Sequence, residues 1–236
     1  MNHMPLKLSF AMVFVSVTAV VAATSLLPDL QRARNRQDRA ALDQLIGRLQ
    51  SAAKSNNSPD DQYQLAAAYS YAAEVAIEQR DKQKAQSYAE SGIDAAKKAV
   101  NNSPNTAEYH RILGELCGQV VPANPLFGGL KYGQCARDEV SKAIQLDANS
   151  GLAYLSRGVG NYYLPAQFGG GIDLALKDFD KAIALNSNLS DAYLWKGIAL
   201  RKVNRNAEAH QAIEKAVQLS PDWVWAKEQL QKTPAR

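Results

Sequence analysis

The sequence predicts an all-α fold made of repeated helical hairpins. Alanine and aliphatic residues dominate, and aromatic residues make up only 8% of the chain, which suits packed helices better than a β-sandwich. The motif Lys-Ala-aliphatic occurs four times, with its alanines at Ala99, Ala143, Ala182 and Ala216. The intervals between these alanines are 44, 39 and 34 residues, and such spacing indicates an internal structural repeat.

Residues 1–23 are predicted to be an export signal that is not part of the fold. Lys7 precedes an uncharged stretch from Leu8 to Pro28, whose apolar core ends in the small residues of Val21-Ala22-Ala23. An uncleaved anchor is the alternative, because the uncharged run is about as long as a membrane-spanning helix requires. The cleaved signal is favoured, and the expected location is the periplasm or cell envelope, with possible membrane association through this segment.

The next segment, 24–37, is expected to be a linker before a repeat domain at 38–232 and a short tail at 233–236. Arginines at 32, 34, 36 and 39 suit anionic lipid, but a solvated helix start is the simpler interpretation. The sequence from Asp38 to Ser55 predicts an amphipathic helix that caps the first hairpin. Its apolar side carries Leu42, Leu45, Ile46 and Leu49.

The hairpin units are expected at about 60–106, 107–150, 151–189 and 190–223, followed by a cap helix. In the last unit, the small and apolar residues that match a repeat motif are Tyr193, Gly197, Leu200, Ala209, Ile213, Ala216 and Pro221. The preceding unit supplies Tyr154, Gly158, Ala175, Phe179 and Ala182. Trp223 and Trp225 are interpreted as capping residues and not as ligand aromatics.

This pattern resembles the tetratricopeptide repeat (TPR) family, strongly over about 107–222 and more weakly over 60–104. It departs from the family at Arg157 and Lys196, and at Ala148 and Ser187 in place of the terminal proline. The resemblance implies a TPR-like α-solenoid of about 3–4 helical hairpins with a capping helix at each end. It also implies a concave face where a partner binds.

The first helix of each unit should supply this concave groove. The side chains expected there are Arg111, Glu115, Leu155, Val159, Tyr162, Leu194, Ile198 and Arg201. Because the middle of this set is apolar, the groove suits an amphipathic helix or an extended peptide, and not a carboxylate clamp. The alternative is that the cap helices cover these residues.

The 10 and 5 extra residues of two units fall in the turn inside each hairpin, at 122–133 and 165–171. Both insertions contain proline and then Phe-Gly-Gly, so we expect two shaped loops that form one docking edge. Its predicted residues are Pro125, Phe127, Gly128, Gly129, Tyr132, Pro165, Phe168, Gly169 and Gly170. The alternatives are that the phenylalanines cover their own hairpins, or that Gly169-Gly170-Gly171 holds a phosphate.

No signature of a nucleotide-binding loop, a nucleophile elbow or a zinc protease is found, so we expect neither an enzyme nor a cofactor. Two cysteines and the isolated His110 and His210 make a metal site improbable. Cys117 and Cys135 bracket the longer insertion, and either a disulfide or two buried thiols fits them.

The net charge of +4 is small and no long basic run occurs, so we expect no nucleic-acid partner. The favoured function is a non-catalytic, protein- or peptide-binding scaffold of the cell envelope. It would act through the groove and the Phe-Gly-Gly edge. The alternative is a periplasmic small-ligand binder associated with a solute transporter, because TPR proteins of that type resemble this chain in overall plan.

Overall fold

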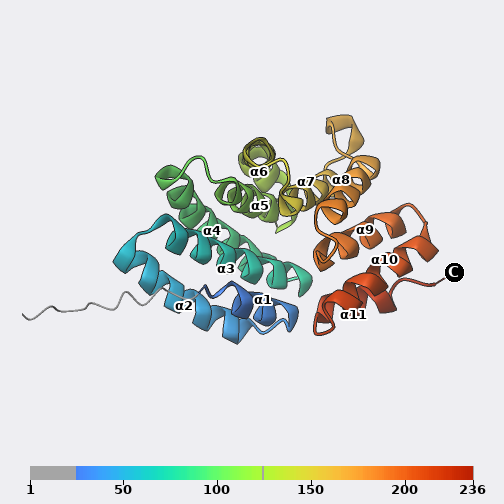
Figure 1. Ribbon diagram of the computed structural model, residues 1–236, viewed down its shortest axis with the longest axis horizontal. Helices are drawn as coiled ribbons and strands as arrows, with labels where there is room; N and C mark the ends of the chain where they lie inside the picture. The colour runs from blue at the N-terminus through green and yellow to red at the C-terminus, as the bar shows by residue number, and fades with distance from the viewer. Residues whose placement is uncertain (1–24, 124, 236) are drawn as a thin grey trace, which may run out of the picture.

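The computed structural model describes residues 25–123 and 125–235, with the backbone alone described at 123, 125–128 and 130 (Figure 1). Over these residues the elements are α1 (Leu27–Asn35), α2 (Arg39–Asn56), α3 (Pro59–Glu78), α4 (Lys82–Asn102), α5 (Ala107–Ala123), α6 (Pro125–Leu146), α7 (Gly151–Tyr163), the 3₁₀ turn η1 (Ala166–Phe168), α8 (Ile172–Leu185), α9 (Ser190–Lys202), α10 (Asn206–Leu219) and α11 (Val224–Gln231).

Helices α3 to α10 form four hairpins, α3/α4, α5/α6, α7/α8 and α9/α10, and each packs against the next. The first helices of successive hairpins also contact one another, so α3, α5, α7 and α9 follow the inner side of the curve (Figure 1). Helix α2 packs on α3 at one end, and α11 packs on α10 at the other. This arrangement confirms the predicted all-α solenoid with a capping helix at each end.

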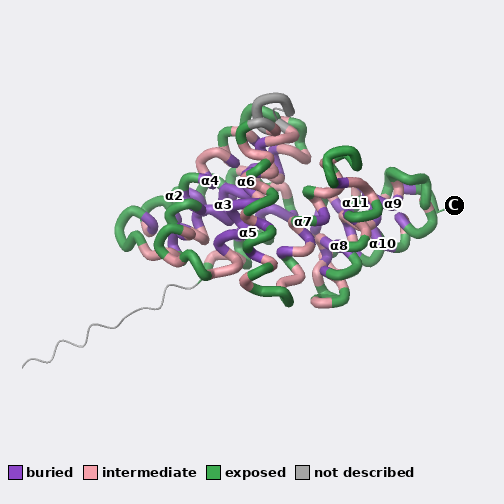
Figure 2. Tube along the Cα trace, turned by 90° about the horizontal axis from the view of Figure 1, so that it is seen from above, coloured by how far each residue is buried: buried purple, intermediate pink, exposed green. Residues whose placement is uncertain are grey.

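The hairpins pack closely because small residues lie where two helices meet. A Cβ atom added to Gly197 of α9 would lie 2.4 Å from Ile213 Cγ1 and 2.8 Å from the backbone oxygen of Ala209, both in α10. Buried residues lie along these helix contacts through the middle of the molecule, while exposed residues lie at the turns and on the outer side (Figure 2).

Side-chain caps fix where several helices begin. The hydroxyl of Ser58 accepts a hydrogen bond from the backbone N–H of Asp61 (3.0 Å) at the start of α3, and Pro59 occupies the first turn. Asp38, Asp81 and Ser150 cap α2, α4 and α7 in the same way. The cap at Asp38 starts α2 directly after a short turn, so the end of α1 lies close to the start of α2.

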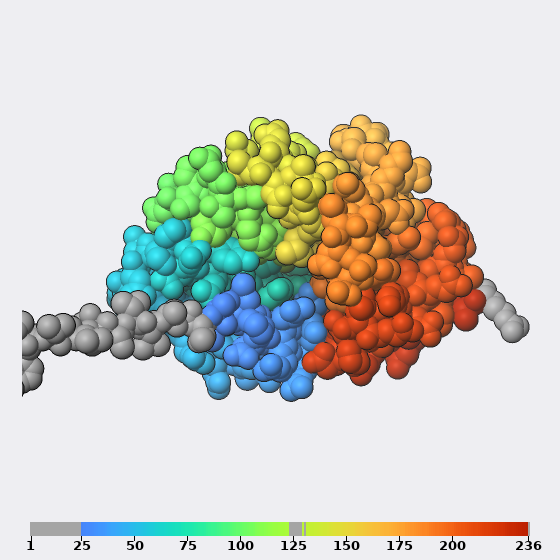
Figure 3. All heavy atoms as spheres, in the orientation of Figure 1, coloured from blue at the N-terminus to red at the C-terminus, as the bar shows by residue number. Residues whose placement is uncertain are grey.

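The segment 24–37 was expected to be a linker, but residues 27–35 form α1. This helix packs on α3 and α2 because Leu30 and Ala33 are buried there. It also reaches the far end of the solenoid, where Arg36 pairs with Asp222 at 3.7 Å. The region of α1 and the C-terminal end of the solenoid therefore touch, as the space-filling view shows (Figure 3).

The first insertion does not form the predicted loop. Helix α5 continues to Ala123 and α6 begins at Pro125, so most of the extra residues lengthen the two helices. Proline is well tolerated in the first turn of a helix, and helix extension satisfies backbone groups that a loop would leave unpaired. A disulfide between Cys117 and Cys135, with Cα atoms 6.0 Å apart, joins the two helices.

Candidate interaction surfaces

The C-terminal part of the predicted groove is covered by the last helix of the chain. Leu194 and Ile198 are buried against Trp223, which is itself fully buried. Arg201 donates a hydrogen bond of 2.7 Å to the hydroxyl of Thr233, which follows α11. These positions match the alternative in which the cap helices cover the groove residues.

The N-terminal part of the predicted groove holds a buried ionic network. Arg111 forms an ion pair of 2.6 Å with Glu108 and a second ion pair with Glu115. Tyr63 donates to Glu108 at 2.9 Å, and Ser70 donates to Glu115 at 2.7 Å. Burial alone would raise the pKa of Glu108, but Arg111 outweighs this effect and holds it below its usual value.

The middle of the groove leads into a row of aromatic side chains. Leu155 is buried, and the half-buried Val159 and Tyr162 pack beside it. The ring centroid of Tyr162 lies 5.6 Å from that of Trp195, which lies 5.6 Å from that of Trp225. The row was not predicted as a unit, because its members come from α7, α9 and the cap helix.

Arg34 is the residue whose environment differs most from expectation. It was interpreted as part of a solvated helix start, yet its side chain is only 4% exposed. Its Nε lies 3.3 Å from a carboxylate oxygen of Glu74 in α3, and its guanidinium pairs with Asp191 in α9. The guanidinium carbon lies 4.2 Å from the ring centroid of Trp223 and 5.4 Å from that of Tyr71.

The acidic groups around Arg34 are strongly affected by burial. Burial raises the pKa of Glu74 to about 7, even though Arg34 acts in the opposite direction. Burial, together with the charge of Glu74, raises the pKa of Glu78 well above its usual value. One carboxylate oxygen of Glu78 and the indole N–H of Trp223 are buried without a hydrogen-bond partner.

The second insertion forms a compact turn with an exposed aromatic residue at its end. The Phe168 side chain is 69% exposed and does not cover its own hairpin. Gly169 and Gly171 have φ angles of +87° and +117°, which favour glycine. The N–H of Gly171 donates to the backbone oxygen of Asn161 at 2.9 Å, which ties the turn to α7.

The first insertion places its predicted edge residues in the first turns of α6. The side chains of Pro125 and Phe127, and Gly128 beside them, lie outside the described residues, so a shared edge with Phe168 stays a prediction. Gly129 lies in the helix, and a Cβ atom added there would meet open space. Tyr132 is directed toward α4, where its hydroxyl donates to Glu90 at 3.4 Å.

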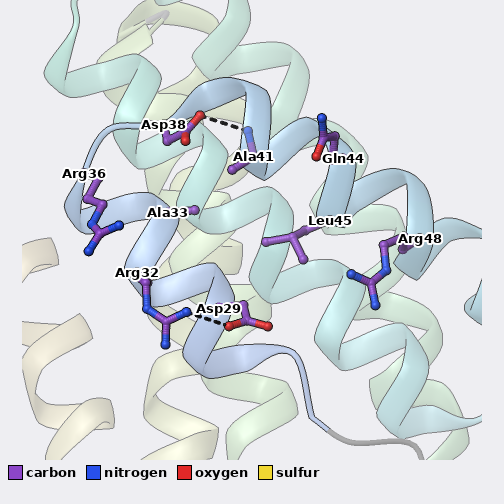
Figure 4. A pocket seen from close by; sticks show the side chains of 9 residues that line it. All are labelled: Asp29, Arg32, Ala33, Arg36, Asp38, Ala41, Gln44, Leu45 and Arg48. Atoms are coloured by element: carbon purple, nitrogen blue, oxygen red, sulfur yellow. Dashed lines mark hydrogen bonds and ion pairs between the residues drawn. The ribbon is translucent and has the colours of Figure 1, made fainter.

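A shallow cleft of ≈ 280 Å³ lies between α1 and α2 (Figure 4). Its rim carries Arg32, Arg36 and Arg48, and Arg32 pairs with Asp29 at 2.9 Å. In the described part of the chain, no group of three or more His, Cys, Asp or Glu residues is arranged to hold a metal ion. No helix over those same residues is both long and apolar enough to cross a membrane.

The stacked hairpins define a TPR-type solenoid, and comparison with solved structures agrees. A thermophilic TPR protein from Thermus thermophilus, TTC0263, superposes with a TM-score of 0.61 at 20% identity, over 88% of this chain and 95% of that one. The HusA haemophore from Porphyromonas gingivalis superposes with a TM-score of 0.53 at 19% identity, over 82% and 94%. At these identities the similarity shows the fold alone.

The sequence identifies the family within this class. Residues 29–164, more than half of the chain, match the family described as Regulator of microtubule dynamics protein 1-3. The chain therefore belongs to this family. Comparison with curated proteins finds no significant match. The matched region begins in α1 and ends directly after α7, so it includes the helix that carries Arg34.

Proposed function

We propose that this protein is a non-catalytic scaffold that binds a protein or peptide partner through the edge at the α7–α8 turn. Phe168 carries the proposal, because a phenylalanine that is 69% exposed contributes little to the fold and suits an interface anchor. Tyr163 and Leu174, which are 49% and 41% exposed, lie on either side of it in the sequence. The exposure of three large apolar side chains within one segment supports the proposal of an interaction site here.

The Gly-rich turn supports this assignment because it holds Phe168 in a defined position. Gly170 is buried, and a Cβ atom added to it would lie 2.2 Å from the backbone oxygen of Leu164. The turn is therefore packed and not loose, which reduces the entropy lost when a partner binds. Phe127 of the neighbouring hairpin belongs to the same edge in our proposal.

The test compares partner capture and stability in matched variants. Phe168→Ala should lose most capture of partners from an extract of the source cells, with unfolding free energy changed by no more than about 0.5 kcal/mol. Leu152→Ala is the control, because Leu152 is 39% exposed at the other end of α7. A fall of about 3 kcal/mol in the unfolding free energy, with unchanged partner capture, would show that Phe168 has a structural role instead.

The proposed location is the periplasm or cell envelope, reached by the signal in residues 1–23. These residues lie outside the described part, so the proposal rests on the sequence. Fractionation with N-terminal sequencing should find a mature start near Thr24. An intact Met1 in the membrane fraction would indicate the anchor, and full-length protein in the cytoplasm would refute export.

The family description refers to microtubule dynamics. A tubulin polymer is the partner to test only if fractionation finds the protein in the cytoplasm, because an exported protein does not meet one. Cosedimentation with polymerised tubulin tests it directly. The small-ligand alternative, a binder associated with a solute transporter, would need an enclosed cavity. The cleft between α1 and α2 is open and edged by charged side chains, so we favour the protein partner.

A further inference from the structure

Arg34 lies in a pocket whose composition is that of a guanidinium-binding site. Trp223 and Tyr71 present their rings to the guanidinium, at 4.2 and 5.4 Å from its central carbon. The carboxylates of Glu74 and Asp191 pair with it. Aromatic faces and carboxylates are the two groups that bind a guanidinium most strongly. The pocket draws on α3, α9 and the residue before α11, so the curvature of the solenoid assembles it.

The inner face holds more carboxyl groups than guanidinium groups. Its buried or half-buried acidic groups are Glu74, Glu78, Glu108, Glu115 and Asp191, and its guanidinium groups are those of Arg34, Arg111 and Arg201. One oxygen of Glu78 and the indole N–H of Trp223 remain buried without a partner. Buried polar atoms are normally paired, so these two point to further polar contacts at this face. A cation beside Glu74 and Glu78 would stabilise their ionised forms, so these two carboxyl groups favour a cationic ligand.

The helix that carries Arg34 is short and is held by the few side chains that it buries. Helix α1 has 9 residues, too few for an isolated helix to be stable, and four of them are buried. It joins α2 through residues 36–38, where Gln37 has a φ angle of +52°, uncommon for a residue other than glycine. Helix α1 contacts α3 on the inner side of the curve (Figure 1), where a TPR-type groove would receive a helical ligand.

We propose that the inner face binds an arginine-bearing helical segment of a partner protein, and that α1 is the built-in occupant that this segment displaces. This inference rests on the proposed function, because its ligand is a segment of a protein partner. It uses a different surface from the Phe168 edge and names the partner's chemistry. The partner helix presents its arginine to Trp223, Glu74 and Asp191, as Arg34 does.

The test uses a fluorescent peptide of residues 25–38 and a matched peptide in which Arg34 is replaced by alanine. The full-length variant Arg34→Ala should bind the arginine peptide at least tenfold more tightly than the alanine peptide. The Arg34→Ala protein should also bind the arginine peptide at least tenfold more tightly than the control variant Arg32→Ala binds it, because Arg32 is exposed and pairs with Asp29 outside the pocket. Equal affinity for the two peptides in a folded Arg34→Ala protein would overturn the proposal.

If Arg34→Ala does not fold, Arg34→Lys replaces it, since lysine keeps the charge but lacks the planar fork. The same preference for the arginine peptide is then expected, and its absence again overturns the proposal. Phe168→Ala, introduced into the Arg34 variant, should leave peptide binding unchanged. Failure of the inner site and failure of the Phe168 edge are therefore distinguishable, because each surface has its own ligand and its own variant.

Discussion

Gly197 sets the distance between α9 and α10, because a side chain there would meet Ile213 and the backbone of Ala209. We predict that Gly197→Ala lowers the unfolding free energy by about 1–3 kcal/mol through overpacking. Gly47→Ala in α2 is the matched control, since a Cβ atom there meets nothing within 4 Å. It should stabilise by about 0.5–1 kcal/mol. Urea denaturation measures the change in unfolding free energy for both variants, and equal changes would contradict this account of the packing.

Glu74 should give the stability a distinct pH dependence. Burial raises its pKa from a usual value near 4.5 to about 7, so folding takes up a proton between these values. Its contribution to stability is therefore largest below about pH 4.5, falls as the pH rises to 7, and is constant above. The other titratable groups facing it are Arg34, Asp191, Glu115 and Glu78.

Glu74→Gln removes this titration while keeping the shape of the side chain. The variant has no ion pair with Arg34, and in the wild-type protein that pair forms only as Glu74 ionises, an effect that the pKa of about 7 already includes. We predict that the difference in unfolding free energy moves in favour of the variant by about 3 kcal/mol across that range. Denaturant titrations at several pH values measure it. A difference independent of pH would show that Glu74 stays ionised throughout.

The environments of Arg34 and Glu74 could not be predicted from the sequence. Arg32, Arg34 and Arg36 look alike in a charged segment, yet only Arg34 points into the fold. Its burial depends on the curvature that brings Asp191 and Trp223 beside α3. A repeat motif specifies contacts between neighbouring hairpins, and it carries no information on contacts between the two ends.

At the scale of elements, the disulfide cross-links the two helices of the α5/α6 hairpin. Cys117 and Cys135 close a segment of 18 residues between α5 and α6. Replacing both cysteines with serine should cost about 3 kcal/mol in the chain-entropy model, a fall of about 6–12 °C in melting temperature. Thiol titration of the unfolded, unreduced protein should find no free thiol. Two free thiols would show that the bond does not form in the isolated protein.

The repeat helices were predictable because each hairpin follows the motif, and the buried positions of α2 match the amphipathic pattern of Leu42, Leu45 and Leu49. The two insertions were not equally predictable. Both contain proline and Gly-Gly, but only the second holds glycines at positive φ, at Gly169 and Gly171. A proline starts a helix as readily as it stiffens a loop, so the sequence of the first insertion is compatible with both.

At the scale of the whole molecule, contact between the two ends should change how the solenoid unfolds. In an open repeat array each unit contacts only its neighbours, so distant units can unfold independently. Here Arg34 links α1 and α3 to α9, and Arg36 pairs with Asp222 just before α11. The N-terminal and C-terminal hairpins are thus coupled directly as well as through the hairpins between them.

This coupling can be observed with two spectroscopic signals. The three tryptophans, Trp195, Trp223 and Trp225, lie in the C-terminal part, so their fluorescence reports on α9 and α11, whereas far-ultraviolet circular dichroism reports on all helices. In the wild-type protein the two urea transitions should coincide. In Arg34→Ala the fluorescence transition should move to lower urea and separate from the dichroism transition, while Arg32→Ala should keep them together. Coincident transitions in a folded Arg34→Ala protein would show that the hairpins between the ends suffice for cooperative unfolding.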